Sequence, residues 1–426
     1  MTIIFIAIII ILLKLSWKYI LRLEPAGVFA ALWIAMIGLV VLFQNIIIIK
    51  PEGILYIFTC VFAFVFSTIF CEAYYNPKDN SKQVLVYNKK YGNAFLIILF
   101  ILSLVNPLYS LTLHGFKLSS LFSISAILNM NETISEDRYS GRDITNTFNQ
   151  AFLIFSYTAP LIGGFCYRLG TKLTKILSIL TLLSGLLVAL TQAMKMGLIT
   201  CIFLWIAGFI ICSYSYRLPI KLNLKRILYT FIGFSLVMII LFISLTLRFG
   251  LLNEKTIELT TDKFIGYVVG SVSCFCIWFD SYDFLDLTYG AKTFWGISNP
   301  LGLLERLQGA YQEFYNIGLN GKLIISNVFT GFRLLIEDFG PWLSILFMGL
   351  AGFLSKMSFT NLQLRNYIVL NQTLLAAIYA YLMWSFATSF FAYTSYIVMF
   401  FLAYFILSFI QDIPNKPEEQ DTHIQS

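Results

Sequence analysis

The sequence is poor in charged residues and nearly devoid of histidine. Only 12% of its 426 residues are Asp, Glu, Lys or Arg, and the two histidines are His114 and His423. Soluble domains carry roughly 25% charged residues, so the composition excludes an ordinary soluble protein. Because no cluster of His and Cys has the spacing of metal ligands, the sequence predicts no metal site.

Several motifs for catalysis and cofactor binding are also missing. The sequence has no Walker-type Gly-rich loop, which argues against ATP hydrolysis, and no Gly-x-Ser-x-Gly motif. Five of the seven cysteines lie in or beside apolar stretches. Cys274 and Cys276 are too close in sequence to bridge each other easily, so no disulfide framework is expected. We predict no cofactor. The net charge of +7 does not indicate a nucleic-acid partner, because the cations lie in short connections between apolar segments.

Long apolar runs are what the sequence has in abundance. Its residues are 58% hydrophobic and its mean hydropathy is +0.80. A membrane-spanning helix needs about 20 apolar residues, because its backbone amides find no water in the bilayer. Eleven segments meet this requirement: 2–21, 26–48, 53–75, 93–112, 147–167, 174–193, 197–215, 227–247, 339–355, 367–388 and 393–411. The sequence therefore predicts an all-α polytopic membrane protein with about 11 transmembrane helices.

Two details refine this interpretation. The first apolar run has no small-residue cleavage site, so we expect a retained helix and not a signal peptide. Polar interruptions within the spans, such as Asn106-Pro107 and Asn371-Gln372, are expected to face neighbouring helices instead of lipid.

The distribution of Lys and Arg predicts the orientation. Alternate connections, near residues 18–22, 78–90, 168–175, 217–226 and 356–365, are rich in cations. The short connections between them hold only Lys50 and Lys195. By the positive-inside rule the cation-rich set is cytoplasmic. The N-terminus is then periplasmic and the C-terminus cytoplasmic, which requires an odd number of spans.

One outside segment, 249–338, is far longer than the others. It contains Trp278, Trp295 and several glycines, which is the composition of a folded cap and not of a tether. Apolar residues recur at helical spacing between Pro300 and Tyr315, so we predict a short amphipathic helix on the membrane surface. The chain then divides into transmembrane helices 1–8 (1–248), a large periplasmic loop (249–338), transmembrane helices 9–11 (339–411) and a disordered cytoplasmic tail (412–426).

Three cations stand where apolar sequence makes them costly. Lys195 lies in a tight turn between two spans, Arg248 ends the eighth span, and Arg333 precedes the ninth. All three are predicted at the same outer level, so the topology lets them converge. Such a cluster suits a pyrophosphate, because guanidinium groups bind phosphate oxygens bidentately. The alternative is that each side chain reaches out to lipid headgroups.

Carboxylates follow Arg333 closely. Helical spacing sets Arg333 and Glu337 on one face, four residues apart. Asp338 opens the next membrane helix together with Phe339-Gly340, where a helix cap is the alternative to a chemical role.

A second acidic group consists of Asp280, Asp283 and Asp286, beside Trp278 and Tyr282. Aromatic faces stack on sugar rings and carboxylates accept hydroxyl protons, so this combination is typical of sugar binding. For at least two of the three aspartates, a solvated face of the cap is the competing interpretation.

The order of residues from Asn327 to Gly340 resembles the C-terminal signature of oligosaccharide repeat unit polymerases, the Wzy-type polymerases of O-antigen and capsule. The segment Tyr267–Ser271, the cation in Lys195-Met196-Gly197 and the long outside loop before the third-last helix are also similar to that family. Pro341-Trp342 departs from its pattern, in which small or aliphatic residues are expected.

The resemblance implies a metal-independent glycosyltransferase of the bacterial inner membrane that acts on the periplasmic side. It would transfer a growing glycan from undecaprenyl pyrophosphate to the non-reducing end of a new lipid-linked repeat unit. Its partners would be undecaprenyl-pyrophosphate-linked oligosaccharides and membrane lipids, with a polysaccharide chain-length regulator as a further partner left open. Arg333, with Arg248 and Lys195, would stabilise the leaving pyrophosphate.

The same reaction needs a group that takes the proton of the acceptor hydroxyl. The resemblance implies Glu337, Asp338 or Asp280 for this role, in falling order.

Two other functions compete with a polymerase. An O-antigen ligase uses the same lipid-linked donor, but it would be favoured by a histidine in the large loop, and 249–338 contains none. A polysaccharide flippase or other transporter would have twelve or more spans in two similar halves, with charges in mid-span. Here the charges gather at the outer face.

Overall fold

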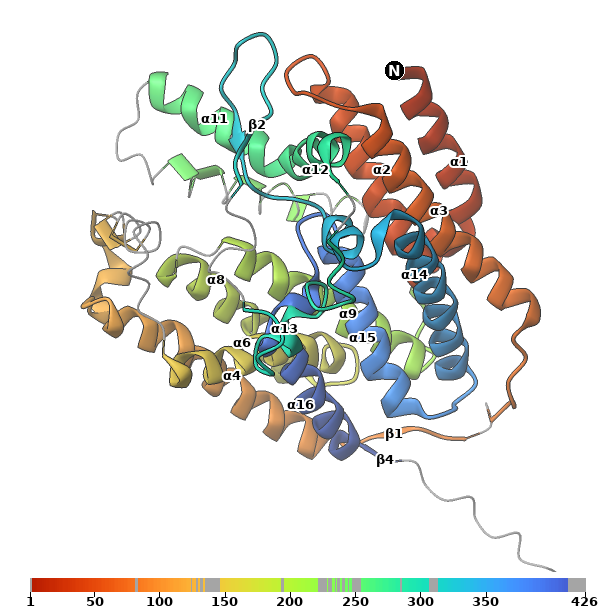
Figure 1. Cartoon of the computed structure of the whole chain (residues 1–426). Helices are drawn as coiled ribbons and strands as arrows, with labels where there is room; N and C mark the ends of the chain where they lie inside the picture. Colours follow the sequence, from red (N-terminus) through yellow and green to blue (C-terminus); the bar gives the residue numbers. More distant parts are fainter. Residues whose placement is uncertain are drawn as a thin grey trace, which may run out of the picture.

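The computed structural model describes residues 2–80, 83–123, 125–127, 129–130, 133–134, 146–192, 195–220, 254–283, 286–305 and 313–412, with isolated positions between 228 and 246. Most of these residues are helical (Figure 1). The longer described helices are α1 (Thr2–Leu21), α2 (Pro25–Phe43), α3 (Pro51–Tyr74), α4 (Lys89–Leu113), α6 (Thr147–Cys166), α7 (Lys172–Leu180), α8 (Leu182–Thr191), α9 (Lys195–Ser215), α11 (Glu254–Val268), α12 (Gly270–Ser281), α14 (Gly331–Gln363), α15 (Ile368–Trp384) and α16 (Thr394–Ile410).

Seven of the described helices are long and apolar enough to cross a membrane, with α7 and α8 counted as one span. The bent pair of α11 and α12 is an eighth candidate. The prediction of a multi-pass helical membrane protein is therefore confirmed. The number eleven stays a prediction. Segment 227–247 lies largely outside the described residues, α15 and α16 are apolar but shorter, and α6 is not among the seven.

Close backbone approach holds the bundle together. α3 packs along α14, and α6 packs between α4 and α9. A Cβ atom on Gly352 would lie 2.2 Å from the carbonyl oxygen of Phe64, and one on Gly208 would lie 2.1 Å from that of Leu161. Because lipid tails are as apolar as the helices, packing of small residues is a main source of helix association in a membrane.

The polar residues within the apolar helices face their neighbours, as predicted. Asn106 is buried and donates from Nδ2 to Oδ1 of Asn149 at 2.6 Å, while Gln192 Nε2 donates to Asn106 Oδ1 at 2.8 Å. At the other end of the bundle Gln372 Nε2 donates to Ser215 Oγ at 2.9 Å. These hydrogen bonds satisfy groups that lipid could not.

The long segment before α14 is more structured than a surface loop. α11 and α12 are bent by 64° at a short break, and together they are apolar enough for a broken span or a re-entrant element. A short helix, α13 (Trp295–Ser298), and a hairpin of β2 (Tyr315–Asn316) and β3 (Ile325–Ser326) follow. The sequence predicted that 249–338 forms a cap outside the membrane. The structure shows that this segment also contains an apolar helix pair.

The hairpin is tied to the helix bundle by the backbone. Ile48 N–H donates to the carbonyl oxygen of Ile317 at 2.7 Å, next to a bridge between Ile47 and Gly318. The amphipathic helix predicted over 300–315 stays a prediction, because 306–312 lie outside the described residues. The described ends of this stretch are a turn and the start of β2.

The opposite end of the bundle is closed by a second small ladder. β1 (Val86–Tyr87) pairs antiparallel with β4 (Gln411–Asp412), which follows α16. Figure 1 shows this ladder at the end of the molecule opposite to the N-terminus and the β2–β3 hairpin. The predicted disordered tail lies, from residue 413 onward, outside the described residues.

Candidate active site at the start of α14

The last residues of the segment Asn327–Gly340 form the start of α14. They make a short helical arm, which a break separates from the rest of the helix. Gly340 has φ = 69°, a left-handed conformation that favours glycine, and Pro341 follows it. Phe332 anchors the arm in the core, where its ring lies 5.1 Å from that of Trp33. The arm thus presents Arg333 and Glu337 at a fixed angle to the long helix that follows.

Pro341 determines which segment of the chain packs against this arm. In a continuous helix the carbonyl of Glu337 would accept from the N–H of residue 341, and proline has none. The N–H of Thr288 donates to that carbonyl instead, at 3.1 Å, and the N–H of Tyr289 donates to the carbonyl of Asp338 at 3.0 Å. The broken helix therefore binds the backbone of the loop before α13.

Asp338 strengthens the same attachment. Its Oδ1 accepts from Thr288 Oγ1 at 2.5 Å and from the Lys292 N–H at 3.0 Å, and its Oδ2 accepts from the Thr293 N–H at 2.6 Å. The side chain is fully buried. A carboxylate with three donors on it is firmly held as an acceptor. Asp338 therefore positions residues 288–293, and Lys292 with them.

The centre of the site is a buried set of alternating charges. Arg333 Nε donates to Glu337 Oε1 at 2.7 Å, and each residue is only 3% exposed. Lys292 Nζ lies 3.0 Å from Glu337 Oε2. The spacing of four residues predicted that Arg333 and Glu337 share a helix face, and the structure confirms that they pair.

Arg333 also reaches toward the surface. Its Nη2 donates to Glu313 Oε1 at 3.1 Å, and the side chain of Glu313 is 55% exposed. The guanidinium carbon lies 4.2 Å from the ring centre of Phe329 and 4.8 Å from that of Trp278, so aromatic faces hold the cation from the sides. The site is closed toward the bundle and opens at Glu313.

Two tyrosines border this charge cluster. Burial raises the pKa of Tyr282, and the negative charge of Glu337 adds to the effect. Burial likewise raises the pKa of Tyr315, with a further contribution from Glu313, while Arg333 acts in the opposite direction. Both hydroxyls therefore keep their proton, and that of Tyr315 donates to Glu313 Oε2 at 3.4 Å.

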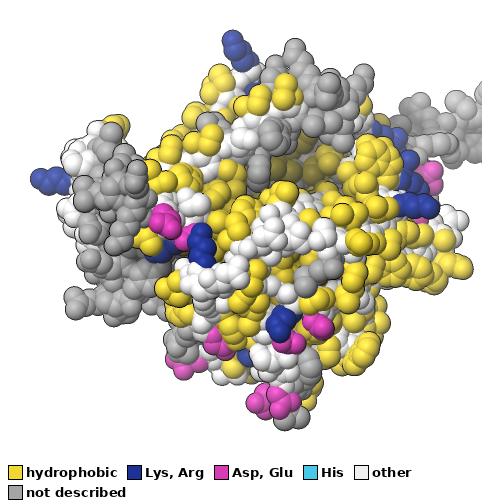
Figure 2. Space-filling model, turned by 90° about the horizontal axis from the view of Figure 1, so that it is seen from above, with side chains coloured by type: hydrophobic (Ala, Val, Ile, Leu, Met, Phe, Trp, Pro, Cys, Tyr) yellow, Lys and Arg dark blue, Asp and Glu magenta, His cyan; other side chains and the backbone are white. Residues whose placement is uncertain are grey.

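Figure 2 shows the end of the molecule that carries this site. Hydrophobic side chains cover much of it and surround a hollow, and charged side chains occur in scattered groups. The long segment has several exposed apolar residues, namely Tyr289, Leu301, Leu303, Phe314, Leu323 and Ile325.

The aspartates of the second acidic group are not part of the central cluster. Asp280 lies two residues from Trp278 on α12, which turns it to a different helix face, and its Oδ2 lies 3.1 Å from Lys50 Nζ. Asp283 and Asp286 are exposed. The structure thus joins Arg333, Glu337 and Asp338 but not Asp280.

The two other predicted cations cannot be placed at atomic detail. Lys195 begins α9 in the tight turn after α8, as expected from the sequence, but its side chain lies outside the described residues. Arg248 lies outside the described residues altogether. Their convergence with Arg333 stays a prediction.

Sequence reasoning missed Lys292 and Glu313. Lys292 left one signal: it is the only Lys or Arg between Lys263 and Arg306, a stretch that contains several carboxylates. Nothing in the sequence marked Glu313, because its pairing with Arg333 spans twenty residues of irregular chain. In the part of the chain that the structure describes, no group of three or more His, Cys, Asp or Glu side chains could hold a metal ion.

Comparisons with protein-family models, with curated proteins and with solved structures found no match for this chain.

Proposed function

We propose that the protein polymerises undecaprenyl-pyrophosphate-linked oligosaccharides into O-antigen or capsular polysaccharide at the periplasmic face of the bacterial inner membrane. The observation that carries this proposal is the buried pair of Arg333 and Glu337, joined by Lys292 and walled by Trp278 and Phe329. Two cations, a carboxylate and aromatic faces are groups that can bind a sugar donor with a pyrophosphate leaving group.

The reaction balances with these groups. A hydroxyl oxygen at the non-reducing end of the acceptor unit forms a bond to the anomeric carbon of the donor glycan. The bond from that carbon to the pyrophosphate oxygen breaks, and its electron pair leaves with undecaprenyl pyrophosphate. The acceptor proton goes to Glu337, which pairs with Arg333 and Lys292.

Arg333 and Lys292 stabilise the charge that develops on the pyrophosphate. Glu313 occupies one edge of the guanidinium, and a pyrophosphate takes its place there, because the Glu313 side chain is half exposed and can turn away into water. Nε of Arg333 stays on Glu337 meanwhile. The arginine thus links the base to the leaving group and fixes the distance between them.

Asp338 positions the loop in this proposal and does not take the proton. Its oxygens already accept three hydrogen bonds, and none of the three donors belongs to a substrate. Asp280 is assigned to the surface, where it pairs with Lys50. Arg248 and Lys195 remain proposed as further pyrophosphate ligands from the end of the eighth span and the turn before α9.

The proposed topology has eleven spans, with segment 249–338 periplasmic and the β1–β4 end cytoplasmic. Support comes from the cation census and from the positions of the chain ends, because Figure 1 places the N-terminus and β4 at opposite ends of the bundle. The exposed apolar residues of the long segment then face the membrane surface, along which two lipid-linked substrates approach.

A test in cells distinguishes this function from its competitors. Deletion of the coding sequence from a host that carries the matching glycan cluster should abolish the polysaccharide ladder while single repeat units still reach the lipid A core. Loss of all surface glycan would favour a flippase or a ligase and contradict the proposal.

The site itself is tested by complementation of that deletion. Glu337→Gln should lower chain growth by about 10²- to 10⁴-fold, the usual range for a general base. Lys322→Ala is the matched control, because Lys322 pairs with Asp262 and not with the central cluster. Membrane levels of each variant, measured by immunoblot, separate lost chemistry from lost insertion. Wild-type ladders from Glu337→Gln would remove this residue from the mechanism.

A further inference from the structure

A second arginine stands beyond the other end of α14. Arg365 follows the helix C-terminus and lines a cleft of about 530 Å³. The cleft lies between the chain that follows α3 and the start of α15, so it opens where apolar helices end. This is the end of α14 remote from Arg333.

The charge of Arg365 is not compensated within the described part of the chain. The residue is only 9% exposed, and among the described residues neither Nε nor Nη1 has a hydrogen-bond partner. Burial, followed by the positive charge of Arg217, lowers the pKa of Arg365. A guanidinium left in this condition is costly unless a negative group binds it.

Other groups that attract anions converge on the same cleft. The exposed Lys78 lines it, and so does Ile368, the first residue of α15. The first turn of α15 has no side-chain cap, and the positive end of the helix dipole lies at this turn. The described residues that line the cleft include no carboxylate.

The walls of the cleft are already in place. Asn80 Nδ2 donates to Asn366 Oδ1 at 2.6 Å, and Asn366 Nδ2 donates to the carbonyl oxygen of Lys78 at 2.8 Å. Tyr75 donates to Asn361 Oδ1 at 2.9 Å. Because the neighbouring elements are cross-linked in this way, a ligand meets a preformed site.

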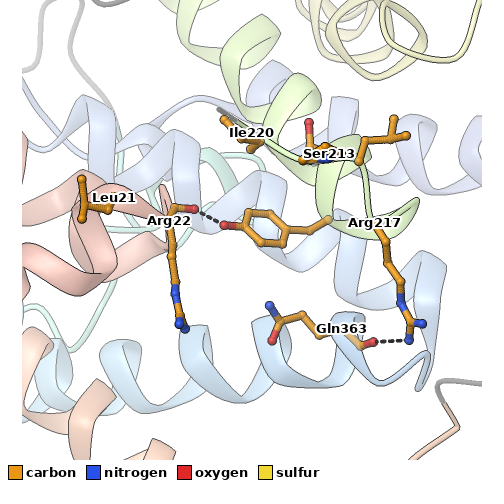
Figure 3. Close-up of a pocket in the computed structure, with 9 residues that line it drawn as sticks. Leu21, Arg22, Ser213, Arg217, Ile220 and Gln363 are labelled. Atoms are coloured by element: carbon orange, nitrogen blue, oxygen red, sulfur yellow. Dashed lines mark hydrogen bonds between the residues drawn. The ribbon is translucent and has the colours of Figure 1, made fainter. Parts of the chain in front are cut away.

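A neighbouring cavity of about 360 Å³ provides the contrast (Figure 3). Two arginines line this cavity, and both have partners. Arg217 Nη2 donates to the carbonyl oxygen of Gln363 at 3.4 Å, and Arg22 Nη1 lies 3.7 Å from Glu24. Tyr214 donates to the Arg22 carbonyl. The internal partners found there are what Arg365 lacks.

We propose that the Arg365 cleft binds a phosphate group, held by the guanidinium of Arg365, the ammonium of Lys78 and the N–H groups at the start of α15. Basic pockets between membrane helices bind phosphorylated lipid headgroups in this manner, and a soluble phosphate has the same chemistry. The site is independent of the polymerase assignment, since it uses none of the residues around Arg333.

The test measures thermal unfolding of the purified full-length protein in a mild detergent, because a ligand that binds only the folded state raises the midpoint. Two probes separate the sources: dioctanoylphosphatidylglycerol, with dioctanoylglycerol as its uncharged control, and inorganic phosphate. We expect at least one phosphate-bearing probe to stabilise the wild type. Arg365→Ala should bind that probe about tenfold more weakly. Lys90→Ala, an exposed cation at the same end, should bind it as the wild type does.

Lys78→Ala is a second variant for the case that Arg365→Ala fails to fold, because replacement of an exposed lysine disturbs the fold less than replacement of a buried arginine. We expect it to weaken binding about threefold. A response to the lipid alone identifies a headgroup, and a response to phosphate alone identifies a soluble ligand. Equal binding by wild type, Arg365→Ala and Lys78→Ala to both probes, or no binding to either, would overturn the proposal.

Discussion

Two buried ion pairs on α14 invite comparison. Near its start Arg333 pairs with Glu337, and near its end Lys356 Nζ lies 2.7 Å from Glu24 Oε2. All four side chains are almost fully buried. The partners differ in origin. The first pair is joined by Lys292 and Glu313 from the long irregular segment, whereas the second joins α14 to the start of α2.

The difference shows which pair can act on a ligand. Arg333 is connected to the surface through the exposed Glu313, so a substrate can replace one of its partners. Lys356 has the Tyr19 and Phe359 rings within 5.6 Å of its ammonium. The second pair also has outer partners, but they are more distant: Arg22 Nη1 lies 3.7 Å from Glu24, and Glu72 Oε1 lies 4.0 Å from Lys356 Nζ. Burial alone therefore does not identify a functional charge, and the close exposed partner of Arg333 is what sets the first pair apart.

The largest effect is expected at Arg333. Arg333→Ala should lower chain growth by about 10³-fold or more, because it removes charge stabilisation of the leaving group and leaves Glu337 with Lys292 alone. Chain length in the complemented deletion strain is the readout. Arg333→Lys should recover only part of the activity, since an ammonium cannot hold both edges of the ligand. A normal ladder from Arg333→Ala would mean that the pair is structural, like its counterpart.

Removal of Lys356 should affect stability and not the reaction, the reverse of what we expect at Arg333. Lys356→Ala leaves the buried Glu24 with only the more distant Arg22 as a partner, so we expect a loss of about 3–5 kcal/mol in stability. Lys356→Met combined with Glu24→Gln should restore most of it, because neither charge is then left without a partner. Thermal unfolding in detergent checks both variants. Full loss of chain growth in a well-folded double variant would show that this pair also serves the reaction.

A smaller effect is expected at the helix break. Gly340→Ala places a Cβ atom at φ = 69°, which costs about 1–2 kcal/mol and tilts the arm that carries Arg333. We expect chain growth to fall about tenfold while the protein still inserts. Gly38→Ala, on α2, is the matched control, because an added Cβ there meets open space. Equal activities of the two variants would argue against the fixed angle of the arm.

The smallest effect on chain growth is expected at Asp280. Asp280→Asn removes an exposed ion pair with Lys50, so we expect less than a twofold change in chain growth. A loss comparable with that of Glu337→Gln would return Asp280 to the active site and move the base away from α14.

The sequence was informative where function depends on local spacing. Apolar runs located most of the described spanning helices, and the interval of four residues predicted the pairing of Arg333 with Glu337. For Asp338 the sequence offered a helix cap or a chemical role and not the anchoring of residues 288–293, which also depends on Pro341, whose missing N–H leaves a carbonyl for the 288–289 backbone.

Contacts across the irregular segment could not be predicted. Lys292 meets Glu337 across forty-five residues of chain, and Glu313 reaches Arg333 across twenty, so no local spacing in the sequence relates the partners. The apolar pair of α11 and α12 also escaped prediction, because the whole of 249–338 was expected to form a periplasmic loop.

Reconstituted chain growth tests the central claim most directly. Purified protein in proteoliposomes would receive a defined undecaprenyl-pyrophosphate-linked oligosaccharide as both donor and acceptor, and products would be separated by length. The wild type should convert single units into a ladder with release of undecaprenyl pyrophosphate, while Arg333→Ala leaves the units unjoined. Single units left unchanged by folded wild-type protein, or ladders of equal length from both proteins, would contradict the account.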